Sequence, residues 1–258
     1  MLVERGLAES REQAQALIME GLVYSPSGKV LKSGVSLAAD IPLEVRGRMP
    51  YVSRGGIKLA HALARFGVEA SGVVALDVGA STGGFTDCLL QRGAQRVFAL
   101  DVGHGQLDYR LRQDQRVTVM EKVNARHPFT LSRQGRGDLS EYGEIPPPSS
   151  SLPPVEGAGV VNLATVDVAF ISVTKVIPAV ASHVKDGGAI IVLVKPQFEA
   201  RREEVGKGGV IKDPTVHARV LARVIVWVVN EGFRLRDLVS SPILGDAGNR
   251  EFFLLLQK

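Results

Sequence analysis

The chain of 258 residues is 45% hydrophobic and carries a formal net charge of +4 at pH 7, which predicts one domain of moderate size with a sizeable core and a small additional module. Its single cysteine, Cys88, excludes an internal disulfide framework, and no apolar run approaches the about 18 residues needed to cross a membrane. Because the N-terminus also lacks the layout of a secretory signal, we expect a soluble protein of the reducing cytoplasm. The isoelectric point of about 9.3 permits an acidic partner such as RNA.

Residues 1–45 predict a small α+β module at the start of the chain. Ser10, followed three residues later by Gln13, forms a capping-box pattern, and the apolar positions that follow at helical spacing predict a helix that stops at Gly21. Short strand-like segments then occupy residues 22–24, 29–31 and 41–45, with a Ser-Pro-Ser-Gly turn between the first two.

Residues 46–56 predict a linker, and the chain from Arg46 to Arg65 contains basic but no acidic side chains. A stretch of this kind could bind the phosphates of a polynucleotide, although charge runs more often belong to an ordinary solvated surface. The apolar spacing that begins at Ile57 predicts a helix immediately after the linker.

The stretch from Val73 to Asp87 has the pattern of strand, tight loop and helix that opens a βαβ unit. Three glycines within the loop let the chain turn sharply and let a ligand approach the backbone, and the helix N-terminus favours an anionic ligand. Ser81 stands where the dinucleotide fingerprint has its second glycine, and no lysine follows Gly84 as a P-loop requires. A purely structural glycine turn remains an alternative for this stretch taken alone.

Asp101 follows the next apolar run, residues 97–100, where a carboxylate could accept hydrogen bonds from both hydroxyls of a ribose. An NAD site would place an acidic residue similarly, so Asp101 by itself does not discriminate between nucleotide cofactors. A third strand is expected at residues 117–120, with its end near Asn124.

Residues 129–159 are rich in proline, serine and glycine and predict a mobile insertion. Strand and helix patterns alternate again beyond it, which predicts a parallel sheet closed by an antiparallel hairpin. The expected elements are strands at 160–168 and 189–194, helices at about 174–184 and 214–229, and a hairpin of 235–243 with 251–256.

Four charged residues stand at or near the carboxyl ends of the predicted strands: Asp77, Asp101, Asp167 and Lys195. In open α/β sheets, ligands bind beyond this edge. Each residue alone is as consistent with a helix cap or a solvated charge as with function, but four on one rim predict a functional site.

Several motifs in consistent order resemble the TlyA group of FtsJ-like methyltransferases, a family also called hemolysin A. They are YVSRGGIKL, ALDVGASTGGFTD, ALDVGHGQL, VKPQFEA, GKGGVIKD and GNREFFLLL. The stretch VERGLAESREQAQALIMEGLVY resembles a small RNA-binding domain shared by a small-subunit ribosomal protein and many pseudouridine synthases, and the chain begins inside that domain. The chain departs from the family at Ala169, where serine is usual, and in a linker without the tryptophan of some members.

The resemblance implies an α/β fold with a Rossmann-like, S-adenosylmethionine-dependent methyltransferase sheet and a terminal antiparallel hairpin at 57–258. It implies an N-terminally incomplete RNA-binding domain at 1–45. The implied activity is methylation of a ribose 2′-hydroxyl, typically of a cytidine, in ribosomal RNA or ribosomal subunits, without a metal. The catalytic tetrad carried over from the family is Lys58, Asp167, Lys195 and Glu251.

The same resemblance assigns binding residues for the cofactor and the RNA. The expected cofactor contacts are Ser53, Asp77, Gly79, Ala80, Ser81, Thr82, Gly83, Gly84, Phe85, Asp101, Val102, Asn124 and Asp167. The expected RNA contacts are Arg5, Arg11, Arg46, Arg48 and Arg54.

The chemistry explains why such a tetrad is needed. A ribose hydroxyl is a poor nucleophile near neutral pH, and a lysine can take its proton only when neutral, although free lysine has a pKa of about 10.4. Burial and a second cation lower a lysine pKa while carboxylates raise it, so the sequence leaves this balance open. We interpret Lys195 as the base, Lys58 as a positioning and tuning residue, and the two acids as groups that orient them.

Other chemistries fit the sequence less well. Methylation of a base carbon needs a cysteine nucleophile, and Cys88 lies within the predicted helix after the glycine loop, where it is more typical of core. The proline-containing run of amine methyltransferases is absent from Asp167 to Phe170. An RNA-binding protein with an inactive methyltransferase fold and a membrane-lytic hemolysin remain as alternatives; the retained tetrad argues against the first and the lack of an obvious pore segment against the second.

Overall fold

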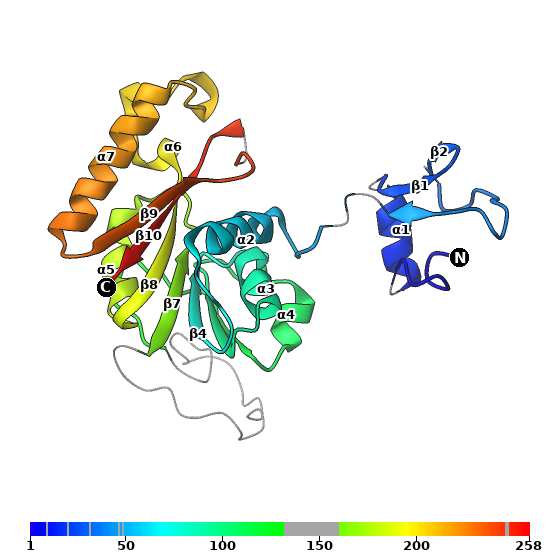
Figure 1. Ribbon diagram of the computed structural model, residues 1–258, viewed down its shortest axis with the longest axis horizontal. Coiled ribbons are helices and arrows are strands. Elements are labelled where there is room, and N and C mark those ends of the chain that lie inside the picture. Colours follow the sequence, from blue (N-terminus) through cyan, green and yellow to red (C-terminus); the bar gives the residue numbers. More distant parts are fainter. Residues whose placement is uncertain are drawn as a thin grey trace. The chain divides into compact units, whose positions relative to one another are not determined.

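The computed structural model describes residues 1–131 and 160–258, except residues 9, 20, 31, 46, 48, 246 and 247. It divides into two compact units, Met1–Pro50 and Tyr51–Lys258 (Figure 1). The division falls inside 46–56, the range expected to be a linker. Most of the expected insertion at 129–159 lies outside the described residues, but Leu131 is described and is buried in the core of the second unit.

The first unit consists of one helix and a small antiparallel sheet. Helix α1 spans Arg11–Met19, and the backbone N–H of Gln13 donates to Ser10 Oγ at 3.2 Å, as the capping pattern predicts. Gly21 adopts a φ of +67°, and its N–H donates to the carbonyl of Ile18, which ends the helix. The strands, in the sheet order β2-β1-β3, are β1 (Val23–Ser25), β2 (Gly28–Lys29) and β3 (Glu44–Val45).

In the described part of the second unit, seven strands form one sheet with the order β6-β5-β4-β7-β8-β10-β9. The first five strands in this order are parallel, whereas β10 runs antiparallel to both of its neighbours, so the predicted hairpin at the edge is confirmed. The strands are β4 (Val74–Val78), β5 (Arg96–Leu100), β6 (Val117–Met120), β7 (Val161–Val166), β8 (Val184–Val194), β9 (Arg234–Ser240) and β10 (Phe252–Gln257).

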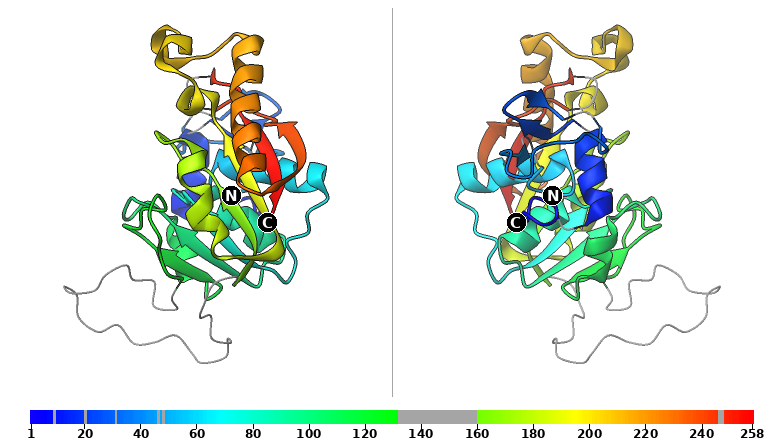
Figure 2. Two further views of the ribbon diagram at one scale, coloured as in Figure 1. Left: turned by 90° about the vertical axis from the view of Figure 1, so that its left-hand side faces the viewer. Right: turned by 90° about the vertical axis from the view of Figure 1, so that its right-hand side faces the viewer.

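Helices cover both faces of this sheet. On one face lie α2 (Arg54–Phe66), α3 (Gly84–Gln91) and α4 (Tyr109–Gln113), and on the other lie α5 (Ile177–Ala181) and α7 (Pro214–Asn230) (Figure 1). The left view of Figure 2 shows α5 and the orange α7 in front of the strands. Short helices connect these elements: η1 (Val173–Lys175), α6 (Pro196–Glu199), η2 (Arg202–Glu204) and η3 (Lys207–Gly209).

The side chains of each central strand alternate between two apolar clusters. Along β8, Ile190 and Val192 pack with α5 and α7, while Ile191 and Leu193 pack with α2 and α3. All four are fully buried. A strand covered on both faces is apolar at nearly every position, which explains the near-continuous apolar runs in the sequence.

The structure differs from the sequence predictions around β8. The helix expected at about 174–184 is divided into η1 and the short α5, and the strand expected from residue 189 already begins at Val184. Gly187 allows this extension because it adopts a φ of +77° inside the strand, where the pairing with β7 shifts register. Helix α2 also begins earlier than expected, at Arg54, so the end of the predicted linker is helical.

Candidate active site

The backbone from the end of β4 to the start of α3 is packed too closely for side chains at Gly79 and Gly84. A Cβ at Gly79, whose φ is +84°, would lie 2.2 Å from the carbonyl oxygen of Asp167 on the neighbouring strand end. A Cβ at Gly84 would lie 2.2 Å from Ser53 Oγ and 2.9 Å from the backbone nitrogen of Gly56. The glycines therefore bring the loop against both the end of β7 and the N-terminus of α2.

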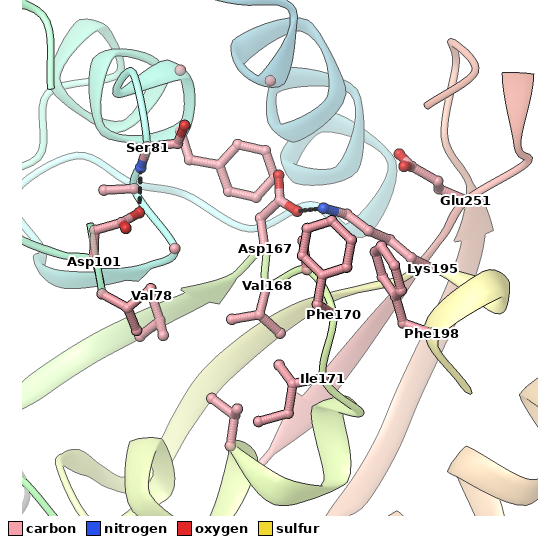
Figure 3. A pocket seen from close by; sticks show the side chains of 18 of the residues that line it. Val78, Ser81, Asp101, Asp167, Val168, Phe170, Ile171, Lys195, Phe198 and Glu251 are labelled. Carbon is pink, nitrogen blue, oxygen red and sulfur yellow. Dashed lines mark hydrogen bonds and ion pairs between the residues drawn. The ribbon is translucent and has the colours of Figure 1, made fainter. Parts of the chain in front are cut away.

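Asp101 fixes the shape of this loop from the end of β5. Its Oδ2 accepts a hydrogen bond from the Ser81 N–H at 2.7 Å (Figure 3). Its Oδ1 accepts one from the Gly103 N–H, also at 2.7 Å. Ser81 adopts a φ of +49°, which is unusual for a residue with a side chain. A carboxylate has about four lone-pair sites, so Asp101 can still accept hydrogen bonds from the hydroxyls of a ligand.

Asp77 lies beneath the loop and does not line the cavity. Its side chain is fully buried, and it accepts hydrogen bonds from Thr86 Oγ1 at 2.7 Å and Thr165 Oγ1 at 2.9 Å. Burial raises the pKa of Asp77 to about 7, and these two hydrogen bonds partly oppose the shift. Asp77 therefore ties β4 to α3 and β7, and any effect it has on a ligand is transmitted through the loop.

The topology of the sheet brings Asp167 and Lys195, the two tetrad residues that follow parallel strands, to the same edge of the sheet. Val166 of β7 is paired with Val192 of β8, so Asp167 and Lys195 leave neighbouring parallel strands at the same edge. Phe252 at the start of the antiparallel β10 is paired with Val194, which places Glu251 beside Lys195.

The tetrad forms two ion pairs that line one cavity. Lys195 Nζ lies 2.5 Å from Asp167 Oδ1 (Figure 3), and Lys58 Nζ on α2 lies 2.6 Å from Glu251 Oε2. Lys58 and Glu251 are both buried. The cavity has a volume of about 890 Å³ and extends from these pairs to the glycine loop and Asp101.

Two phenylalanines border the cavity near the Asp167–Lys195 pair. Phe170 is 91% exposed and has a φ of +62°, and its ring centroid lies 5.0 Å from that of Phe198 on α6 (Figure 3). Such an exposed aromatic face could stack on a nucleobase. No stacking role was expected for Phe170, although an aromatic residue three positions after a strand-end acid is a usable signal in the sequence.

The structure places most of the expected cofactor residues around the same cavity. The expected residues that line it are Ser53, Gly79, Ala80, Ser81, Thr82, Gly84, Phe85, Asp101, Val102, Asn124 and Asp167. Asp77 and Gly83 are not among the lining residues. Gln106 was not among the expected cofactor residues, although it belongs to the motif ALDVGHGQL. It also lines the cavity and accepts a hydrogen bond from Ser81 Oγ at 3.3 Å.

The structure describes three of the five expected RNA-binding arginines, and these three differ in their surroundings. Arg54 lines the cavity, whereas Arg11 is exposed at the first position of α1. The guanidinium of Arg5 donates to the backbone carbonyls of Ala39 and Ile41 within the first unit. Arg46 and Arg48 lie outside the described residues.

Other kinds of reactive site have no support in the described residues. Cys88 is buried in the α2–α3 face of the core, and burial raises the pKa of its thiol to about 11, so it is a core residue and not an accessible nucleophile. Within the described ranges, no three His, Cys, Asp or Glu side chains are grouped to hold a metal ion.

Residues 51–258, which include the whole sheet and the cavity, match the family of FtsJ-like methyltransferases. The chain belongs to the FtsJ-like methyltransferase family. This FtsJ-like methyltransferase is 44% identical over 257 residues to "Putative rRNA methyltransferase YqxC" of Bacillus subtilis, which covers 99% of this chain and 83% of that protein.

Two further comparisons extend beyond the catalytic unit. The FtsJ-like chain is 39% identical to "16S/23S rRNA (cytidine-2'-O)-methyltransferase TlyA" of Mycobacterium tuberculosis over 99% of this chain and 87% of that protein. The solved "Putative hemolysin from Streptococcus thermophilus" superposes with a TM-score of 0.70 and 40% identity, over 100% of this chain and 86% of that one. Both matches include the N-terminal unit, so that unit is shared with these relatives.

Proposed function

We propose that this FtsJ-like enzyme transfers a methyl group from S-adenosylmethionine to the 2′-hydroxyl of a ribose, that of a cytidine, in ribosomal RNA. The observation that carries the proposal is the pair of ion pairs, Lys58–Glu251 and Lys195–Asp167, which face the same cavity as the glycine loop. The cytidine and the ribosomal RNA enter from the Mycobacterium tuberculosis relative, whose name states that substrate.

The glycine-loop half of the cavity fits the cofactor. The missing Cβ atoms at Gly79 and Gly84 leave backbone exposed, and the carboxylate of Asp101 has free acceptor capacity for a ribose diol. S-adenosylmethionine supplies a methyl group on a sulfonium, which is transferred by direct displacement. The protein contributes by aligning the acceptor oxygen with that methyl group, and such alignment can account for about 7–11 kcal/mol of a barrier.

The tetrad half of the cavity fits the acceptor ribose. We assign Lys195 as the group that removes the hydroxyl proton, because it stands at the strand edge within the cavity and Asp167 holds its Nζ at 2.5 Å. Lys58 and Glu251 are the more buried pair and position the first pair from the side of α2 and β10. The exposed ring of Phe170 supports this assignment, because it offers the base of the same nucleotide a stacking surface.

We propose that Met1–Pro50 supplies affinity for RNA and no catalytic group. None of the four tetrad residues lies in this unit, which has its own small core of Leu2, Ala8, Leu17, Val23 and Val30. Arg11 is exposed there and could contact a phosphate, whereas Arg5 is engaged in binding two carbonyls of its own unit.

The decisive experiment is methyl transfer from labelled S-adenosylmethionine to separated small and large ribosomal subunits that lack 2′-O-methylcytidine. The labelled RNA is digested to nucleosides and the product identified by mass spectrometry. We expect 2′-O-methylcytidine with the wild type and no label with Lys195→Ala. A label on a base would exclude the proposed reaction, and equal labelling of the ribose by both proteins would exclude the proposed role of Lys195.

The solved relative from Streptococcus thermophilus is named a putative hemolysin, so membrane lysis is the second activity to test. None of the helices in the described part of this chain is long and apolar enough to span a membrane. Release of a trapped dye from lipid vesicles, measured with the wild type and Lys195→Ala, distinguishes lysis from methyl transfer. Lysis by both variants would establish an activity independent of the tetrad.

A further inference from the structure

Glu199 lies at the end of α6, in the chain that follows β8. Its carboxylate binds the segment that follows β7 and carries Asp167. Its Oε1 accepts a hydrogen bond from the Val173 N–H at 2.7 Å, and its Oε2 accepts one from Ser172 Oγ at 2.6 Å. Helix α6 begins at Pro196, immediately after Lys195. The carboxylate of Glu199 therefore joins the segment after Asp167 to the helix after Lys195.

This carboxylate makes no direct ion pair in the described part of the chain, although the charge of Arg223 acts on it. Burial raises the pKa of Glu199, and the hydrogen bonds from Ser172 and Val173 and the charge of Arg223 oppose the shift. Among the ion pairs of the described residues none includes Glu199, and the guanidinium of Arg223 on α7 is bound to Glu204 at 2.8 Å. A largely buried carboxylate that accepts two hydrogen bonds from one segment is suited to hold that segment in place.

The segment needs such a restraint because its backbone is unfavourable. Phe170 lies between Asp167 and Ser172 and has a φ of +62°, a conformation that residues with a side chain rarely adopt. Strained backbone of this kind persists only where surrounding contacts enforce it. Two contacts with α6 do so here: the Phe170–Phe198 ring contact at 5.0 Å and the Glu199 hydrogen bonds.

We propose that Glu199 is a positioning residue, which fixes the segment from Asp167 to Val173 against α6 and so sets the Asp167–Lys195 contact and the projecting ring of Phe170. This inference rests on the proposed methyl transfer for its effect on turnover. It assigns Glu199 no contact with cofactor or RNA, because neither Glu199 nor Ser172 is among the residues that line the cavity.

Four variants of the full chain test this role. Glu199→Ala removes both hydrogen bonds to Glu199. Ser172→Ala removes only the one from the hydroxyl, together with the contacts of Ser172 Oγ with the Thr174 N–H at 3.3 Å and Thr174 Oγ1 at 2.7 Å. Glu199→Gln keeps both, because the amide oxygen can accept from the Val173 N–H while the amide NH₂ donates to Ser172 Oγ. The control is Asp114→Ala, which removes hydrogen bonds to Arg116 between α4 and β6, on the opposite face and far edge of the sheet from α6.

The first measurement is amide hydrogen exchange followed by mass spectrometry, without RNA. We expect faster exchange across residues 168–173 and 195–200 in Glu199→Ala, a smaller increase in Ser172→Ala, and wild-type exchange in Glu199→Gln and Asp114→Ala. Unchanged exchange in Glu199→Ala would overturn the proposal whether or not the wild type methylates RNA.

The second measurement is steady-state methyl transfer by folded protein, with cofactor affinity determined by calorimetry. For Glu199→Ala we expect kcat to fall about 10- to 100-fold, as for small displacements of catalytic groups, with unchanged cofactor affinity. Glu199→Gln should retain kcat, and adding Ser172→Ala to Glu199→Ala should cause no further loss. Wild-type kcat in Glu199→Ala would overturn the positioning role, whereas absence of turnover in the wild type would count against the proposed function alone.

Discussion

Lys195 Nζ and Asp167 Oδ1 lie 2.5 Å apart, each at the end of a strand in the parallel part of the sheet. In such a pair, Lys195 can act in one of two ways. It can lose its proton and then accept the proton of the ribose hydroxyl, or it can stay charged and hold the substrate by its positive charge. The two roles differ in whether the cation must lose its proton, and substitution of Lys195 can separate them.

Lys195→Ala is therefore expected to lower kcat by about 10²–10⁴-fold, the usual contribution of a general base. Lys195→Arg should be equally inactive, because arginine keeps the charge but does not deprotonate in proteins. Both rates are measured by single-turnover methyl transfer with saturating cofactor. Lys185→Ala, an exposed lysine on the same strand, is the control. Near wild-type turnover by Lys195→Arg would leave this lysine as a positioning charge.

Asp101→Ala is expected to weaken cofactor binding by about 10- to 100-fold, because hydrogen bonds to a charged group contribute about 1.5–3 kcal/mol each. The substitution also releases the Ser81 and Gly103 amides that shape the loop. Calorimetry with S-adenosylmethionine measures the effect, and Asp186→Ala, at a fully exposed position of β8, serves as the control. Equal affinities of all three proteins would argue against a cofactor site at this loop. Gly79→Val is a poorer probe, since its Cβ would collide with the backbone of Asp167 and disturb the fold.

Asp77→Asn should change how stability depends on pH. The pKa of Asp77 is about 7 in the folded protein and 3.8 ordinarily, so the folded state binds this proton more tightly. The stabilisation by protonated Asp77 is complete below pH 3.8 and is lost as the pH rises to about 7. Over this range the free energy of unfolding falls by at most about 1.4 kcal/mol per pH unit.

Urea unfolding of the wild type and Asp77→Asn at pH 5, 6, 7 and 8 tests this expectation. The asparagine does not titrate, and other groups contribute equally to both proteins. The free energy of unfolding of the variant relative to the wild type should therefore increase up to about pH 7 and then level off. A difference that is independent of pH would show that Asp77 is already ionised throughout this range.

Removal of Met1–Pro50 should weaken RNA recognition and leave the cofactor site intact. A chain that begins at Tyr51 keeps the hydrogen bond from the Val52 N–H to Asp87 Oδ2 at 2.8 Å. We expect KM for RNA to rise on the order of tenfold or more, and the salt dependence of binding to decrease by about 0.7–0.9 per lost phosphate contact. Cofactor affinity is measured in parallel. Loss of cofactor binding would show that the two units do not act independently.

Local features of the site were predictable from the sequence. The strand, loop and helix from Val73 to Asp87 follow from residue spacing and from glycines that only a tight turn requires, and α3 and β4 occupy that stretch. The edge of a parallel sheet also places residues that follow successive strands together, which anticipated Asp101, Asp167 and Lys195 around one cavity.

The partners within the site were decided only by the tertiary structure. Lys58 and Glu251 are 193 positions apart, and they meet because β10 pairs with β8 and brings Glu251 to the edge where α2 begins. The burial of Asp77 beneath the loop and the left-handed backbone of Phe170 likewise depend on neighbours from other strands and helices. Backbone preferences of adjacent residues determine helices, strands and turns, whereas a hydrogen bond across the sheet depends on strand order, pairing register and packing, which no local pattern contains.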